Sequence, residues 1–212
     1  MYGKLLVAGT VLALQAGFAQ AQARDSGFYG GVDLGRSGLH ASGGGIDGAL
    51  ANQGIGASSS TDNRDTSYGL NLGYRVNQYW GVEAAYTRLG DFAYSSNVAS
   101  PAADTVQGSY KVNALSVAAL GIVPLPSNWS LYGKAGIART DTTLGASSAT
   151  GATSVSGASG QSNGLVLGVG AMYDINRSLY TRVGWDHYAD VGTDATGKSN
   201  INTFNIGVGM RF

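Results

Sequence analysis

The chain lacks cysteine and has little proline and little charge. Among its 212 residues there are no Cys, 3 Pro and one glutamate, Glu83, and only 12% of the residues are charged. The absence of Cys excludes disulfides, thiolate metal sites and Cys nucleophiles. So little Glu and Lys argues against a helix-rich cytoplasmic enzyme. From this composition we expect no metal site and no cofactor.

The chain also lacks a hydrophobic run of transmembrane-helix length. The apolar run from Leu5 to Leu14 is shorter than the ~20 residues that a spanning helix needs. It follows Lys4 and precedes the small-residue triplet Ala21-Gln22-Ala23, which is the pattern of a secretory signal peptide. We therefore predict a signal peptide over residues 1–23 and export of residues 24–212. Any membrane-spanning element in the exported part must then be a strand.

A net charge of one sign is missing as well. The chain has 13 basic and 13 acidic residues, so removal of Lys4 with the signal peptide leaves 12 against 13. This balance gives no basic footprint for nucleic acid. The acidic residues of the loops have no calcium-loop spacing, and we interpret them as solvated side chains.

What the chain does have is a regular alternation of apolar side chains with small or polar ones. In the closing stretch, Asn200 to Phe212, every second side chain from Phe204 onward is large and apolar and those between are small or polar. A period of two is that of a β-strand whose two faces meet different surroundings. The alternating residues are Phe204, Ile206, Val208, Met210 and Phe212.

The same alternation recurs in seven other segments. These are Gly27–Leu39, Tyr68–Val76, Tyr79–Leu89, Tyr110–Val123, Trp129–Thr140, Asn163–Tyr173 and Leu179–Tyr188. Four long connections rich in small residues alternate with three short ones; the long ones cover residues 40–67, 90–108, 141–162 and 189–199. An even strand number with this alternation is typical of outer-membrane barrels, whose short turns are periplasmic. We predict an all-β fold, an eight-stranded antiparallel up-and-down transmembrane β-barrel.

Two details of the barrel follow from the pattern. In the segment Tyr110–Val123 two registers compete, because either Leu115 and Val117 or Leu120 and Ile122 can form the outer face. Aromatic residues at the strand ends are typical of the two membrane interfaces. The expected girdles contain Phe28, Tyr74, Tyr79, Trp80, Trp129, Tyr173, Tyr180 and Phe212 at one edge and Tyr68, Tyr110, Trp185, Tyr188 and Phe204 at the other.

Four stretches resemble the transmembrane domain of the outer membrane protein A family. They are GLNLGYRVNQYWGVEAAYTRL (69–89), LYGKAGI (131–137), YTRVGWDHY (180–188) and FNIGVGMRF (204–212). The resemblance implies a monomeric barrel in the bacterial outer membrane, in contact with lipid and lipopolysaccharide. Many members continue into a periplasmic peptidoglycan-binding domain; nothing follows Phe212 here, so we expect no such domain.

The resemblance also implies partners in assembly. The terminal Phe with alternating apolar residues before it resembles the signal that the outer-membrane assembly machinery reads. Phe204, Ile206, Val208, Met210 and Phe212 are therefore the candidate assembly signal. Periplasmic chaperones are expected to carry the chain to that machinery.

Charged residues on the inward face are the candidate site. They are Asp33, Arg75, Glu83, Lys134, Arg182, Asp186 and Arg211. The resemblance places Glu83, Lys134 and Arg182 in the interior ion-pair network of the family, with Ala119 where the fourth strand of relatives has a basic residue. Removing one partner of a buried pair costs roughly 3–5 kcal/mol, so such charges must be paired. They form either a plug that fills the lumen or a gate that opens a small pore.

Catalysis is the remaining class of function. Lipid A hydrolysis by a barrel needs a His near a Ser nucleophile and a carboxylate. The only histidines are His40, in a loop, and His187, beside Trp185 on the lipid-facing row with no nearby Ser on its strand. We therefore expect no enzyme. The predicted role is structural or surface-interacting, in membrane integrity, adhesion or host contact through four loops, and the alternative is a narrow, low-conductance channel.

Overall fold

The chain forms antiparallel strands throughout the part that can be described. The computed structural model describes residues 26–39, 56–61, 64–100, 104–148, 158–192 and 199–212. The predicted signal peptide and His40 lie outside the described residues. The strands are β1 (Gly27–Leu39), β2 (Gly56–Thr61), β3 (Arg64–Arg75), β4 (Trp80–Ser100), β5 (Asp104–Pro124), β6 (Trp129–Ser148), β7 (Ala158–Asp174), β8 (Leu179–Val191) and β9 (Ser199–Arg211).

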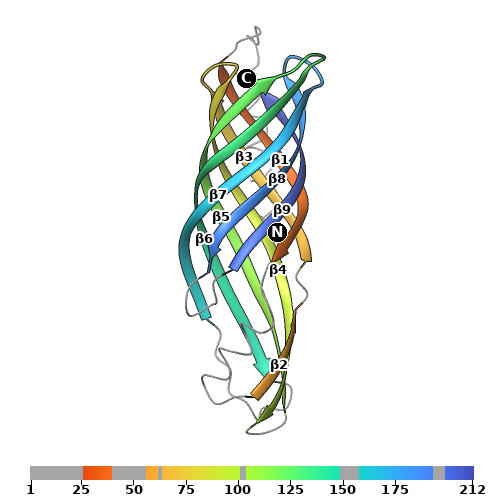
Figure 1. The fold of residues 1–212 in the computed structure, drawn as a ribbon, viewed down its shortest axis with the longest axis vertical. Helices are drawn as coiled ribbons and strands as arrows, with labels where there is room; N and C mark the ends of the chain where they lie inside the picture. The colour runs from red at the N-terminus through yellow and green to blue at the C-terminus, as the bar shows by residue number, and fades with distance from the viewer. Residues whose placement is uncertain (1–25, 40–55, 62–63, 101–103, 149–157, 193–198) are drawn as a thin grey trace, which may run out of the picture.

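Eight of these strands close into a barrel (Figure 1). β1 pairs with both β3 and β9, and the order continues through β8, β7, β6 and β5, which pairs back with β4. β2 pairs only with β4, beyond the last β3–β4 pair, so it continues the position of β3 and adds no ninth position to the ring. The predicted eight-stranded antiparallel barrel is confirmed. Within the described residues, no helix has the length and hydropathy required to cross a membrane.

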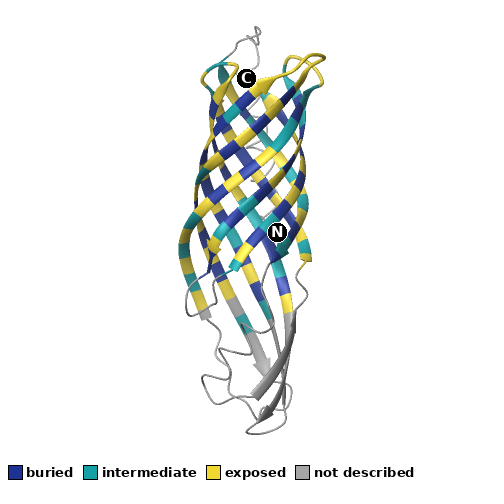
Figure 2. Cartoon of the chain, in the orientation of Figure 1, coloured by how far each residue is buried: buried dark blue, intermediate teal, exposed yellow. Residues whose placement is uncertain are grey.

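Buried and exposed residues alternate along the barrel strands, as the alternating dark blue and yellow segments of the ribbon in Figure 2 show. On β3, Leu70 and Leu72 are 61% and 59% exposed, whereas Asn71 between them is 6% exposed. The exposed row is apolar and the buried row is small or polar, which is the reverse of a soluble barrel. Such a surface is stable in hydrocarbon, where a closed sheet also leaves no backbone group unpaired.

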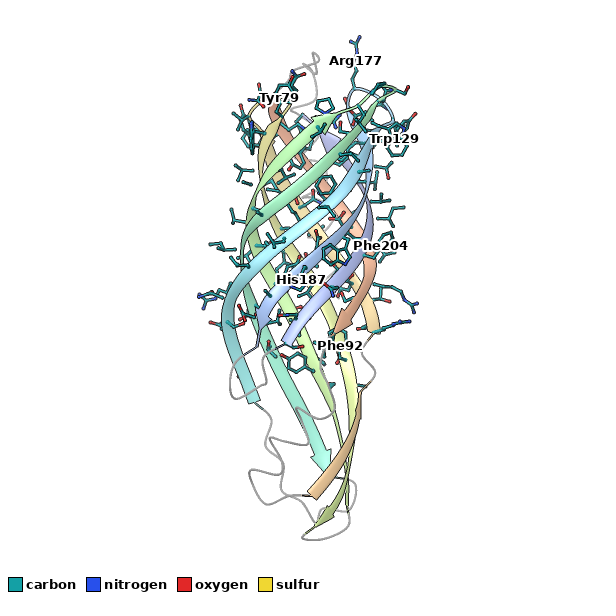
Figure 3. All side chains as sticks on the ribbon, viewed as in Figure 1. Tyr79, Phe92, Trp129, Arg177, His187 and Phe204 are labelled. Atoms are coloured by element: carbon teal, nitrogen blue, oxygen red, sulfur yellow. The ribbon has the colours of Figure 1, made fainter. Side chains whose placement is uncertain are left out.

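Three short turns lie together at one end of the barrel, near Tyr79, Trp129 and Arg177 (Figure 3). In the first turn, the Asn77 side-chain oxygen accepts hydrogen bonds from the amides of Tyr79 and Trp80, at 2.8 and 2.9 Å. Asn176 does the same for Ser178 and Leu179 at 2.9 and 2.8 Å. Local side chains therefore fix these turns, as Asn commonly does.

The strands at the other end are longer than predicted. β4 and β5 have 21 residues each and β6 has 20, about twice the 9–11 residues that a transmembrane strand needs. Most of residues 90–108 and part of 141–162, predicted as loops, are therefore paired strands that project past the barrel with β2 (Figure 1). The prediction was wrong because these Gly- and Ser-rich segments are held by backbone pairing, which leaves no hydrophobic period in the sequence.

The register of β5 is settled by burial. Leu115 and Val117 are about half exposed, whereas Leu120 and Ile122 are buried. Ala119 is also exposed, so it cannot occupy an inward position that a basic residue has in relatives. Leu120, which pairs with Lys134, occupies the inward position instead. That expectation for Ala119 was wrong.

Three tyrosines expected in the girdles point into the lumen instead. Tyr110, Tyr180 and Tyr188 are 8%, 2% and 1% exposed. Strand-end position alone suggested an interface, but the strand parity of each residue places it on the inner face. The other aromatic residues of both expected girdles are on the outer surface.

Large inward side chains lie over glycines of the neighbouring strands. A Cβ added at Gly73 would meet the Tyr29 ring at 2.3 Å, and one at Gly209 would meet the Tyr180 ring at 2.3 Å. Only glycine leaves room for a ring at these positions. Pairing of a bulky residue with a glycine therefore lets a narrow barrel contain several tyrosines.

Candidate functional site: the charged layer of the lumen

Arg182 is the centre of a buried charged layer. Its Nη1 donates to Glu83 Oε2 at 2.7 Å and its Nε donates to Asp33 Oδ1 at 2.8 Å. A further bond joins Nη2 to Asp33 Oδ2, so the guanidinium binds the Asp33 carboxylate in a bidentate fork. The three residues come from β8, β4 and β1, and the charges therefore tie opposite sides of the barrel together.

Lys134 on β6 joins the same layer. Its Nζ lies 3.0 Å from Asp186 Oδ2 and 4.0 Å from Glu83 Oε1. Neutral groups complete the network, since Tyr29 donates to Glu83 at 3.1 Å and Asn205 to Asp186 at 3.0 Å. Lysine is thus shared between two carboxylates, with Asp186 the nearer.

The layer contains more acid than base. Asp33, Glu83 and Asp186 carry three formal negative charges and Lys134 and Arg182 carry two positive ones, a formal sum of −1. The Glu83 and Arg182 side chains are 2% and 4% exposed. Each cation in this buried layer neutralises more than one carboxylate. Removing a cation is therefore expected to lower the stability of the barrel more than removing a carboxylate.

The other two candidate residues lie outside this layer. Arg211 pairs with Asp174 at 2.5 Å and lies over the Tyr180 ring, 5.1 Å from its centroid. Arg75 approaches the Met172 sulfur at 3.9 Å. Both arginines are at the short-turn end of the barrel. The structure therefore brings together five of the seven candidates and separates Arg75 and Arg211 from them.

Apolar side chains fill the lumen on both sides of the charged layer. Toward the short turns, Leu120, Ile122, Tyr132 and Met172 form one cluster. Toward the projecting strands a larger cluster forms. Its most deeply buried members, all 0–1% exposed, are Leu89, Phe92, Val112, Ala114, Val166, Tyr188, Val191 and Ile201. The interior of an eight-stranded barrel is just wide enough to be filled in this way.

Two members of the larger apolar cluster, Phe92 and Val191, were missed from the sequence because a β-bulge before each of them changes the inward parity of its strand. On β4 the pairing shifts between Arg88 and Gly90, so that even-numbered Phe92 points inward although odd-numbered Glu83 does so before the bulge. A second shift lies between Tyr188 and Val191 on β8, where Asp190 has a φ of 56°. At the first bulge Gly90 has a φ of 149°, which favours glycine. The presence of a glycine at this position was the signal that the sequence offered for the bulge.

A small cavity remains beside the charged layer. Its volume is about 20 Å³, and Asp33, Lys134, Arg182 and Asp186 are among its lining residues. That volume accommodates about one water molecule. Asp186 Oδ1 and Asn205 Oδ1 are buried there without a hydrogen-bond partner in the protein. The described residues contain no group of three or more His, Asp or Glu side chains able to hold a metal ion.

Four of the candidate assembly residues lie on the outer face of β9, and the fifth, Phe212, directly follows the strand. Phe204, Ile206, Val208, Met210 and Phe212 are 40–63% exposed. The strand itself completes the barrel, and the Phe212 amide donates to the Phe28 carbonyl at 2.9 Å.

His187 also lies on the outer side. It stacks on Trp185 with the ring centroids 6.0 Å apart, and its Nδ1 is 2.7 Å from Asn202 Oδ1.

Comparison with known proteins decides the family. The family model described as outer membrane protein beta-barrel domain matches residues 6–212. The chain belongs to this family. It is 29% identical over 206 residues to outer membrane protein A of Serratia marcescens, covering 93% of this chain and 53% of the relative. The chain thus spans about half the length of that curated relative, and the predicted outer membrane protein A resemblance is confirmed.

Solved structures of family-like barrels share the fold. Neisserial surface protein A superposes with a TM-score of 0.57 at 16% identity, covering 88% of this chain and 99% of that one. Outer membrane protein OprG of Pseudomonas aeruginosa gives 0.52 at 19% identity, covering 90% and 97%. The family and these barrels place the chain in the bacterial outer membrane, as predicted. The three short turns are then at the periplasmic end and the projecting strands are extracellular.

Proposed function

We propose that this protein is a closed barrel whose function lies at the cell surface, in membrane integrity, adhesion or host contact. The observation that carries the proposal is the filled lumen. Arg182, Glu83 and Asp33 bridge the middle of the barrel, and apolar clusters lie on both sides of them. Among the described residues these layers lie across the lumen one after another, which favours a role outside the pore.

The extracellular strands support the same proposal. β4 and β5 pair as far as Val98 and Asp104, and β5 and β6 pair as far as Val106 and Ser148. These pairs lie well beyond the apolar belt, the band of outward apolar side chains that faces the membrane. Paired backbone holds this part of the chain in a projecting sheet, which costs less to order on binding than a free loop. We propose that this sheet, together with the loops that follow it, is the contact surface.

The second candidate is a narrow channel gated by the ion pairs. One observation favours it: Lys134 is within 3.0 Å of Asp186 and within 4.0 Å of Glu83, so it has two alternative carboxylates. Movement of Lys134 between them would rearrange the charged layer. The apolar cluster around Phe92 and Val112 opposes conduction, because it would remain closed after such a rearrangement.

The proposal includes no catalysis and no cofactor. His187 faces outward, is hydrogen-bonded to Asn202 and stacks on Trp185, an arrangement suited to packing at the interface. We propose that the protein is a monomer that contacts outer-membrane lipid and lipopolysaccharide. The outward row of β9, from Phe204 to Phe212, is proposed as the signal for the assembly machinery, reached with periplasmic chaperones.

A hairpin replacement tests the surface role. Residues 95–107 would be replaced by Asn-Gly, which closes a tight hairpin between the paired residues Tyr94 and Gly108 and keeps the register of the membrane strands. Bacteria that display the full chain, the variant or neither would be counted after attachment to epithelial cell layers. We expect the variant to fold, as heat-modifiable gel mobility reports, and to lose the attachment that the full chain confers. Equal attachment by both chains would contradict a role for this hairpin.

A further inference from the structure

Five cations lie on the outer surface where the apolar belt ends on its extracellular side. On three strands the last apolar side chain of the outward row is followed on the same face by arginine: Leu34 by Arg36, Tyr86 by Arg88 and Ile137 by Arg139. On β3 and β5 the cation follows after one intervening polar residue. We call Arg36, Arg64, Arg88, Lys111 and Arg139 the basic rim.

The basic rim covers one side of the barrel only. Its residues are on β1, β3, β4, β5 and β6, which are consecutive neighbours in the ring. With about 4.8 Å between neighbouring strands, the rim is about 20 Å wide. On the remaining strands, β7, β8 and β9, the residues at the end of the outward apolar row are Asn163, His187 and Asn202, which carry no formal charge when His is neutral.

The three arginines that follow the belt directly have no carboxylate partner among the described residues. The Arg36 side chain is exposed and makes no hydrogen bond with them, whereas the Arg139 side chain donates to the amide oxygen of Gln161. Arg88 donates to the Tyr68 hydroxyl at 3.3 Å and lies 5.8 Å from the centre of that ring. The Tyr68 contacts hold the guanidinium in place while leaving its charge uncompensated.

Acidic residues offset the rim only in part. Lys111 pairs with Asp91 at 3.6 Å, and Asp141 is exposed two residues beyond Arg139 on the same face. Arg36, Arg88 and Arg139 make no ion pair with the described residues, so the outer surface at this level presents positive charge. The surface therefore fits an anion at the depth where the hydrocarbon ends.

We propose that the basic rim is a binding site for the phosphate groups of a phosphorylated glycolipid in the outer leaflet, the lipid A part of lipopolysaccharide. Two features select this ligand. The rim directly continues the apolar belt, so one molecule places acyl chains on the belt and phosphate on the rim. Arginine also presents a planar donor fork that binds phosphate through two hydrogen bonds. The inference deepens the proposed lipopolysaccharide contact and rests on it.

Binding of purified lipid A to the refolded full chain in detergent micelles tests the site. The dissociation constant would be measured by native mass spectrometry for diphosphorylated and dephosphorylated lipid A. The test variant combines Arg36→Gln, Arg88→Gln and Arg139→Gln, and the matched control is Arg177→Gln, an exposed arginine at the periplasmic end. We expect the triple variant to bind the diphosphorylated lipid at least about tenfold more weakly, since each lost bond is charge-assisted.

Further measurements make each result decisive. The parent chain should prefer the phosphorylated lipid, the Arg177→Gln variant should bind like the parent, and Arg→Lys at the three positions should give intermediate affinity. Unchanged affinity in the triple variant, or equal binding of both lipids by the parent, would overturn the proposal. Binding of a soluble sulfated polysaccharide in place of lipid A would overturn the choice of ligand. Should the triple variant fail to fold, Arg36→Gln alone is compared. Surface attachment that persists when lipid A binding is lost would leave the proposed surface function intact.

Discussion

Replacing Arg182 by Met should destabilise the barrel far more than replacing Glu83 by Gln. Arg182 Nη1 donates to Glu83 at 2.7 Å and its Nε to Asp33 at 2.8 Å. Arg182→Met therefore leaves the Asp33 carboxylate without a cation and leaves buried Glu83 with only Lys134, 4.0 Å away. Breaking a buried ion pair in this way costs about 3–5 kcal/mol. Glu83→Gln keeps an acceptor for Arg182 and for the Tyr29 hydroxyl, 3.1 Å away, and removes the excess negative charge. Its expected cost is about 1–2 kcal/mol, the difference between charged and neutral hydrogen bonds.

Urea unfolding of the chain refolded into phosphatidylcholine vesicles would measure both values, with tryptophan fluorescence as the probe. Arg177→Met, in an exposed periplasmic turn, is the control for loss of a cation and should change the unfolding free energy by less than about 0.5 kcal/mol. A Glu83→Gln variant as destabilised as Arg182→Met would refute the reasoning from charge balance. So would an Arg182→Met variant as stable as the parent.

Three further substitutions test other parts of the account. Gly73→Ala places a Cβ 2.3 Å from the Tyr29 ring and should lower the unfolding free energy by about 1–3 kcal/mol; Gly133→Ala, whose nearest heavy atom would be 3.9 Å away, should be tolerated. Phe92→Ala removes a side chain that is 1% exposed and should cost about 3–5 kcal/mol in the same urea assay. Phe212→Ser should reduce the amount of folded chain in the outer membrane while leaving refolding in vesicles possible, and an unchanged amount in cells would remove Phe212 from the assembly signal.

The fold could be predicted because a transmembrane barrel imposes its pattern on the sequence. Each strand must present apolar side chains to lipid, so Leu70 and Leu72 alternate with Asn71 and Gly73, and the period is visible without any structure. Glu83 was also identifiable as inward-facing because it lies between the outward Val82 and Ala84. Where the membrane acts on one face of a strand, sequence alone gives the orientation of its side chains.

The remaining features depend on contacts that leave no periodic signal. β4 and β5 extend past the apolar belt because their backbones pair there, as Ser95 does with Gln107. The apolar extracellular cluster depends on a bulge between Arg88 and Gly90 that turns Phe92 inward. The composition of the charged layer depends on the stagger of the strands around the barrel, which brings Arg182 to Asp33 and Glu83 but leaves Arg75 and Arg211 at one end.

The conductance of the refolded chain in planar lipid bilayers tests the central claim most directly. The charged layer around Arg182 and the apolar cluster around Phe92 fill the lumen in series. We therefore predict no steady single-channel current from correctly folded protein, as judged by heat-modifiable mobility, in the parent chain or in Glu83→Gln. A steady, ohmic current that Phe92→Ala leaves unchanged and Glu83→Gln increases would contradict the closed-barrel account and support the gated channel.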